Sequence, residues 1–198
     1  FMMAVHGLDV KAGLDLILHT PGGDIAATES IVDYLQRKFQ RDIRCIVPQI
    51  AMSAGTMIAC CSKEILMTRH SNLGPIDPHV VGLPARGLIS EIEKAIEEIK
   101  KDPDRATFWR SVFLQIQPTF LSQCQNAVKW SEGFVRSQLA TGMLKGKASN
   151  PALKAWSIVK KLGSFEKNKS HSRHIHYDEC RAMALNVSLI EEDPDPEL

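Results

Sequence analysis

The chain has 198 residues, a length that suits one domain with peripheral elements. Hydrophobic residues make up 44% and charged residues 24%, which excludes general disorder and allows a sizeable core. With 24 Lys and Arg against 23 Asp and Glu, the net charge of +1 lacks the basic excess of a dedicated nucleic-acid binder. No apolar run approaches 18 residues, so the sequence predicts no membrane-spanning helix.

The first part of the chain predicts a right-handed βαβ unit. Residues 14–19 form a short apolar run typical of a buried parallel strand, and Thr20-Pro21-Gly22-Gly23 ends it with a turn signal. Asp24 then opens an amphipathic helix, and residues 43–47 predict a second strand. Strand, glycine turn, helix and strand in this order are the parts of that unit.

The remaining pattern alternates strands and helices, with one long helical region. Helices are expected at 57–61, 88–101, 107–117, 119–144, 151–161 and 178–185, strands at 64–67 and 187–190, and a Pro/Gly-punctuated loop at 71–79. The sequence therefore predicts a single α/β domain, with a core at about 1–87 and 162–190 and a helical excursion at about 88–161. Phe1 is not an initiator residue, so we expect the true N-terminus to be missing.

Two segments could carry chemistry. The Gly22-Gly23 turn lets the backbone approach a ligand with exposed N–H groups, although a plain strand-to-helix turn would look the same. Ser53 stands after a strand and before a helix, where its hydroxyl is exposed and the next N–H can complete an oxyanion hole. A helix-capping serine is the competing interpretation.

The two segments are one βαβ unit apart, so both are expected at the carboxyl edge of neighbouring parallel strands. A serine beside a cradle of backbone amides is a layout for acyl transfer. Neither G-x-G-x-x-G nor G-x-x-x-x-G-K-[ST] occurs, so a nucleotide site has no support.

Residues 14–27 (LDLILHTPGGDIAA), 47–59 (VPQIAMSAGTMIA) and 71–78 (SNLGPIDP) resemble, in this order, the serine dehydrogenase proteinase family. That family belongs to the Clp-fold, crotonase-like superfamily and is more distantly similar to signal peptide peptidase A. The resemblance implies an α/β fold with a ββα core and an inserted helical region. It implies Ser53 as nucleophile and Gly22, Gly23 and Ala54 as sources of oxyanion-binding amides.

The family is described as using Ser, Asp and His in that chain order, whereas Clp protease uses Ser, His and Asp. Asp77 lies in the loop where Clp protease carries its histidine, and His171 lies in the segment where Clp protease carries its aspartate. The resemblance therefore implies His171 as general base, oriented by Asp77. His79 is an alternative base, and Lys94 (or Lys100 or Lys101) is the alternative if the enzyme uses the Ser-Lys dyad of signal peptide peptidases.

The expected function is a serine endopeptidase that needs no metal and no organic cofactor. The alternatives are a non-peptidase acyl-thioester enzyme of the crotonase-like fold and an inactive assembly or binding module. The partners implied are a peptide or protein substrate and further copies of the chain, with no nucleic acid, and with membrane association only through upstream residues. Cys45, Cys60, Cys61, Cys124 and Cys180 lack a paired pattern, so we expect buried reduced thiols in a cytoplasmic protein.

Overall fold

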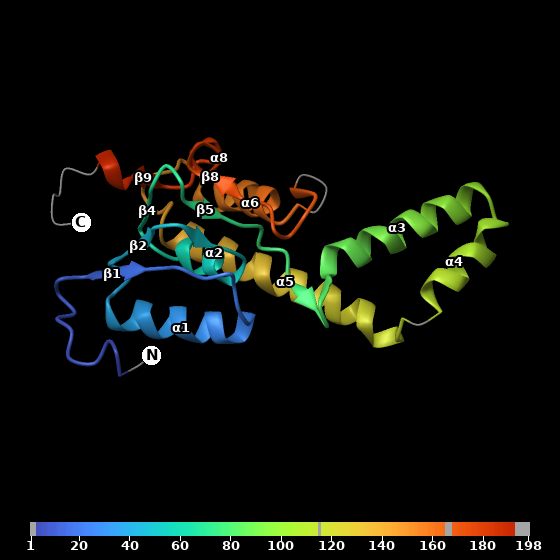
Figure 1. Ribbon diagram of the computed structural model, residues 1–198, viewed down its shortest axis with the longest axis horizontal. Helices are drawn as coiled ribbons and strands as arrows, with labels where there is room; N and C mark the ends of the chain where they lie inside the picture. The colour runs from blue at the N-terminus through green and yellow to red at the C-terminus, as the bar shows by residue number, and fades with distance from the viewer. Residues whose placement is uncertain (1–2, 115, 165–167, 193–198) are drawn as a thin grey trace.

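The computed structural model describes residues 3–114, 116–164 and 168–192. A four-stranded parallel sheet with the strand order β1-β2-β4-β9 forms its centre. Its strands are β1 (Leu14–Ile17), β2 (Ile43–Val47), β4 (Glu64–Met67) and β9 (Val187–Leu189). The α/β fold expected from the sequence is confirmed by this sheet and by the helices that surround it (Figure 1).

A second, smaller sheet sits beyond the carboxyl ends of β2 and β4. It has the order β3-β5-β8, in which β3 runs parallel to β5, and β5 antiparallel to β8. These strands have two residues each: β3 (Ile50–Ala51), β5 (Asn72–Leu73) and β8 (Ile175–His176). A hairpin of β6 (His79–Val80) and β7 (Leu83–Pro84) follows β5 in the chain.

The helices are α1 (Ile25–Lys38), α2 (Ala54–Ala59), α3 (Ala85–Lys101), α4 (Arg105–Phe113), α5 (Pro118–Thr141), α6 (Pro151–Leu162) and α8 (Tyr177–Ala182). A 3₁₀ turn at Ile190–Glu192 follows β9. The start of α1 is fixed by Asp24, whose side chain accepts a hydrogen bond from Ala27 N at 2.9 Å. Asn150 caps α6 in the same way through Leu153 N, at 3.0 Å.

The main hydrophobic core joins the sheet to α2, α6 and the second half of α5. It contains Cys45 and Val47 from β2, Ile65 and Met67 from β4, and a set of helical side chains: Met57, Phe134, Val135, Leu139, Ile158, Val159 and Leu162. All five cysteines are buried and free. Burial in this core raises the pKa of Cys45 to about 12, which keeps that thiol protonated and unreactive at neutral pH.

The expected helical excursion is divided in the structure. Figure 1 shows α3 and α4 as an arm that projects away from the sheet, whereas α5 leads back to it and packs along α6. Trp109 holds the arm together: it is buried, its indole N–H donates to Glu98 Oε2 at 3.0 Å, and it stacks on Phe113. Helix α6 and the second half of α5 thus belong to the core, and only α3 and α4 project away from it.

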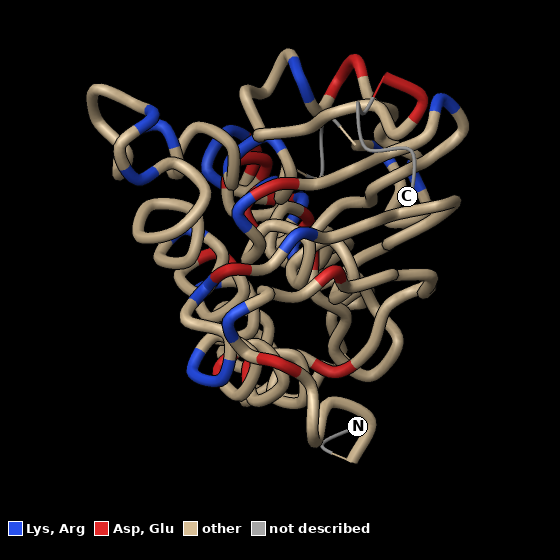
Figure 2. Tube along the Cα trace, turned by 90° about the vertical axis from the view of Figure 1, so that its left-hand side faces the viewer, with Lys and Arg blue, Asp and Glu red and all other residues tan. Residues whose placement is uncertain are grey.

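Segments with Lys or Arg and segments with Asp or Glu are interspersed along the trace in Figure 2. Within the described part of the chain, no helix combines the length and the apolar character that crossing a membrane requires.

Candidate active site

Ser53 stands at a sharp turn between β3 and α2. Its backbone has φ 51° and ψ −112°, a left-handed conformation that non-glycine residues rarely adopt. Although Ser53 occupies the N-cap position of α2, its side chain makes no capping hydrogen bond. The capping interpretation therefore does not account for this serine, and its hydroxyl is held in a partly exposed position by a strained backbone.

The segment that contains Gly22 lies directly against Ser53. Thr20 extends the small sheet, since its N–H donates to Ile50 O and its carbonyl accepts from Met52 N, both at 3.0 Å. Gly22 has φ 131°, and a Cβ atom placed on it would lie 3.0 Å from Ser53 Cβ and 3.6 Å from Ser53 Oγ. Glycine is thus required at position 22 by both its backbone conformation and the closeness of Ser53.

Two backbone N–H groups near Ser53 are free to bind a ligand oxygen. The N–H of Gly22 donates to Thr20 Oγ1 at 3.1 Å. Among the described residues, the N–H groups of Gly23 and Ala54 have no hydrogen-bond acceptor. These two residues are close together, since a Cβ on Gly23 would lie 3.9 Å from Ala54 Cβ. Of the three expected amide donors, Gly23 and Ala54 are available and Gly22 is occupied.

Thr56 is a site residue that the sequence did not reveal. Its hydroxyl is completely buried and lies 2.7 Å from Ala51 O, 2.9 Å from Gly74 O and 2.9 Å from Gly74 N. It therefore ties α2, which follows Ser53, to the loop that leads to Asp77. The only signal in the sequence is a hydroxyl residue three positions after Ser53, which is too common to single out.

Asp77 and His171 are brought together by the small sheet. The β5–β8 register pairs Asn72 with His176 and Leu73 with Ile175, and beyond these pairs His171 makes a hydrogen bond to the backbone of Asp77. The carboxyl group of Asp77 is buried and accepts a 3.4 Å hydrogen bond from Arg86 N. Burial raises the pKa of Asp77 to about 6, and the Arg86 N–H and guanidinium oppose this rise only in part.

The His171 imidazole is half-buried between Asp77 and His79. The ring centroids of His79 and His171 are 4.0 Å apart, in an edge-to-face arrangement. Burial lowers the pKa of His171, the nearby His79 lowers it further, and a hydrogen bond to the backbone of Asp77 acts in the opposite direction. His171 Nδ1 is buried and has no hydrogen-bond partner among the described residues. Partial burial also lowers the pKa of His79, so both rings are neutral at pH 7.

The structure does not complete a hydrogen-bonded triad. Within the described chain, no hydrogen bond joins Ser53 Oγ to His171 or His79, and the interaction of His171 with Asp77 is through the backbone. Catalytic contacts of this kind often tighten only when substrate binds.

Lys94 lies elsewhere, on α3 of the arm. It is exposed, and its ammonium group is 5.8 Å from the ring centroid of Trp109. Lys100 and Lys101 are in the last turn of the same helix. Figure 1 shows α3 well apart from α2, at whose start Ser53 is placed. The described residues contain no group of three His, Cys, Asp or Glu that could hold a metal ion.

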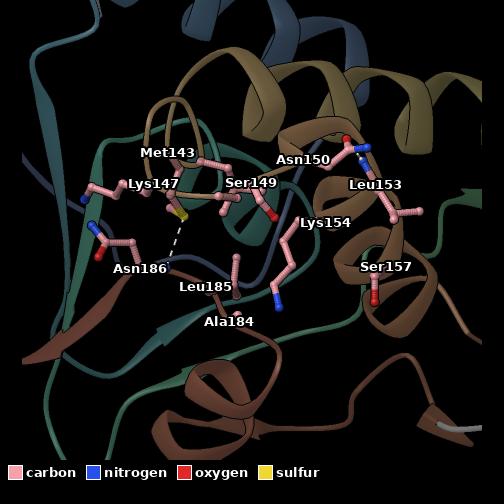
Figure 3. A pocket seen from close by; sticks show the side chains of 12 residues that line it. Met143, Lys147, Ser149, Asn150, Leu153, Lys154, Ser157, Ala184, Leu185 and Asn186 are labelled. Carbon is pink, nitrogen blue, oxygen red and sulfur yellow. Dashed lines mark hydrogen bonds between the residues drawn. The ribbon is translucent and has the colours of Figure 1, made fainter.

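A cavity of about 690 Å³ has a lining that does not include Ser53 (Figure 3). It lies between the α5–α6 connection and Ala184–Asn186, where Asn186 N donates to Met143 Sδ. Asn186 directly precedes β9, so the cavity opens at the amino edge of the parallel sheet. Ser53 follows the carboxyl end of β2, at the opposite edge.

Comparison with known proteins places the chain in a family. The model of the ClpP-like SDH-type serine proteinases matches residues 3–184. Uncharacterized protein MJ0137 of Methanocaldococcus jannaschii is 30% identical over 186 residues, which cover 94% of this chain and 57% of that protein. Uncharacterized protein MJ1495 of the same organism is 34% identical over 89 residues, which cover 45% of this chain and 30% of that protein.

No solved structure matches the chain. The chain spans a little over half the length of the first of these relatives. The family model covers nearly the whole chain, including the Gly22-Gly23 turn and Ser53. The chain therefore belongs to the ClpP-like SDH-type serine proteinases.

Proposed function

We propose that the protein is a serine endopeptidase that cleaves peptide bonds through an acyl-enzyme on Ser53. The observation that carries this proposal is the strained backbone of Ser53. It holds a hydroxyl that has no hydrogen-bond partner close to the free N–H groups of Gly23 and Ala54. Strain of this kind costs about 1–3 kcal/mol and persists where function requires it. A plain structural turn would not need a non-glycine residue in this conformation.

In this mechanism, Ser53 Oγ attacks the carbonyl carbon of the scissile peptide bond. The N–H groups of Gly23 and Ala54 stabilise the oxyanion that forms, and the positive end of α2 adds to the field there. The acyl group then stays on Ser53 until water hydrolyses the ester. The loss of one such amide donor would lower kcat by about 10²–10³-fold.

His171 is the proposed general base. It takes the proton of Ser53 Oγ as the new bond forms and returns it to the leaving amine. Its lowered pKa keeps it neutral, and therefore able to accept a proton, at pH 7. Asp77 orients His171 through its backbone and supplies a buried carboxyl group beside it.

A fluorophosphonate probe tests the nucleophile. We expect the probe to label the protein and a Ser53→Ala variant to remain unlabelled. Ser111→Ala, which alters an exposed serine of α4, is the matched control and should be labelled like the parent. Equal labelling of the parent and Ser53→Ala would contradict the proposal.

The base is tested by assaying His171→Ala, His79→Ala and Lys94→Ala side by side on a peptide substrate, with Ser53→Ala as the floor. We expect His171→Ala to fall to that floor and Lys94→Ala to keep full activity. A His171 base with a lowered pKa also predicts that kcat/KM rises with pH at a midpoint below about 6.5. Full activity in His171→Ala would move the base to His79 or to a lysine.

A further inference from the structure

A groove of about 560 Å³ lies between α1 and α5. None of the residues that line it takes part in the proposed acyl-transfer mechanism. One wall carries Glu29 and Asp33 from α1, and the other carries Trp130, Phe134 and Gln138 from α5. Its lining thus has two carboxylates and an indole, and no Lys or Arg is among the described residues that form it.

Hydrogen bonds join the two walls of the groove. Trp130 Nε1 donates to Glu29 Oε2 at 3.0 Å, while 44% of the Trp130 surface remains exposed. Further along α1, Gln36 Nε2 donates to Gln138 Oε1 at 2.8 Å, and Arg41 donates to the same oxygen at 3.0 Å. These bonds join α1 to α5 at the Gln138 end of the groove, where Arg41 brings a positive charge.

Along α1, the Glu29 end of the groove is the end nearer to Gly23, one of the proposed oxyanion-binding residues. Asp24, which caps α1, follows Gly23 directly, and Glu29 lies five residues further on. A helix rises about 1.5 Å per residue, so Glu29 is about 7.5 Å along the axis from Asp24. An extended peptide advances about 3.3 Å per residue. If the scissile carbonyl of such a peptide binds the Gly23 N–H, the side chains two to four residues away are at a distance comparable to that of Glu29.

The chemistry of the groove suits a cation with an aliphatic stem. Carboxylates attract the charge, and the face of an exposed indole binds ammonium and guanidinium groups. Asp33 pairs with Arg37 at 2.9 Å, but these side chains are 58% and 80% exposed, so this pair is weak and leaves the negative charge accessible.

We propose that the groove between α1 and α5 binds a Lys or Arg side chain of the peptide substrate, two to four residues from the scissile bond. This inference rests on the proposed peptidase function and names a substrate class for it: peptides with a basic residue near the cleavage site.

Binding is measured on the full chain carrying Ser53→Ala, so that no turnover is needed. The probes are blocked octapeptides in pairs that differ at one position, Lys in one and norleucine in the other, with that position moved along the peptide. Trp130 fluorescence reports occupancy, and Trp130→Phe identifies its share of the signal. At one position or more, the Lys peptide should bind at least about fivefold tighter at low salt. This preference should shrink in about 0.5 M NaCl.

Charge-neutralising variants separate the groove from general electrostatics. Glu29→Gln with Asp33→Asn keeps an acceptor for Trp130 and should bring the two peptides to within about twofold. Glu97→Gln with Asp104→Asn removes the same charge from the arm and should keep the preference. Equal binding of Lys and norleucine peptides at every position, or an unchanged preference in the Glu29/Asp33 variant, would overturn the inference.

Fluorophosphonate labelling of the parent keeps the two proposals apart. Labelled Ser53 without a Lys preference would refute the basic-residue site and leave the peptidase proposal intact. Unlabelled Ser53 with a Lys preference would refute the peptidase proposal and leave the groove as a cation site.

Discussion

The backbone conformation of Ser53 costs free energy, and its side chain makes no hydrogen bond that would compensate for this cost. The angles φ 51° and ψ −112° are close to the mirror image of an extended conformation, which glycine adopts freely and other residues do not. Replacing the side chain by another one keeps this strain, whereas removing Cβ releases it. The stability of the fold and the presence of a hydroxyl are therefore opposed at this residue.

This opposition predicts that Ser53→Gly unfolds with a free energy about 1 kcal/mol higher than Ser53→Ala, although both lack the hydroxyl. The gain in unfolding free energy is the strain energy that is released, minus the free-energy cost of the greater conformational entropy of glycine in the unfolded chain. Urea denaturation of the two variants measures the difference. A Ser53→Gly protein that is less stable than Ser53→Ala would show that the turn is not strained.

The titration of Asp77 makes the stability of the fold depend on pH. Burial raises its pKa in the fold to about 6, above the ordinary value of 3.8. Between these two values, the folded chain holds a proton that the unfolded chain has released, so its contribution to stability is present below about pH 3.8 and is lost as pH rises through about 6.

Asp77→Asn lacks this titration. Going from pH 4 to pH 7, the parent should lose on the order of 2 kcal/mol of unfolding free energy relative to Asp77→Asn. Urea denaturation of both proteins at several pH values measures this difference, in which other titrating groups cancel. A difference that stays constant with pH would mean that Asp77 titrates normally.

At the scale of elements, the site depends on the close approach of α2 to the Thr20 strip. A Cβ atom on Gly55 would lie 2.5 Å from Thr20 Cγ2 and 3.3 Å from Ala51 Cβ. Together with the bonds of Thr56, this contact leaves the start of α2 only one position relative to the small sheet.

Gly55→Ala should therefore cost about 1–3 kcal/mol of unfolding free energy through overpacking. Thr20→Ser removes the clashing methyl and keeps the hydroxyl that binds Gly22, so the double variant should recover much of the loss. Gly133→Ala, in a part of α5 where nothing lies within 4 Å of the new Cβ, is the control and should be neutral or stabilising. Equal losses with and without Thr20→Ser would contradict this contact.

The sequence predicted the elements that have a clear period and missed those that do not. The strand at 43–47 and the helix opened by Asp24 were correct, because several apolar residues repeat in each. The strands β3, β5 and β8 have two residues, too few for any periodicity, and the segment containing β5 was read as a loop. These short strands align the site, so the approach of His171 to Asp77 and His79 depends on pairings that one sequence does not display.

At the scale of the molecule, the arm joins the rest of the chain only at its base, where Ala85 of α3 packs with Cys124 and Val128 of α5. The arm holds one large buried residue, Trp109, while Phe108, Val112 and Leu114 are about half or more exposed. Few buried apolar contacts mean a low free energy of local opening. The arm should open without unfolding the sheet.

Trp109→Ala should release the arm alone, because its loss removes the packing with Phe113 and the bond to Glu98. We expect trypsin to cleave rapidly after Lys100, Lys101 and Arg105 while the core fragment persists, as mass spectrometry would show. Trp156→Ala, on the exposed side of α6, is the control and should leave the pattern unchanged. Simultaneous loss of the core in Trp109→Ala would mean that the arm and the core unfold together.

The pairing of β4 with β9 sets an order of events during synthesis. Ile65 pairs with Val187, so the sheet cannot be completed until Val187 has left the ribosome. The Ser53 turn and its amides come from residues 20–74, whereas His171 emerges about a hundred residues later. A nascent chain therefore carries the proposed nucleophile well before the proposed base, so the proposed acyl-transfer site stays incomplete until the chain can fold.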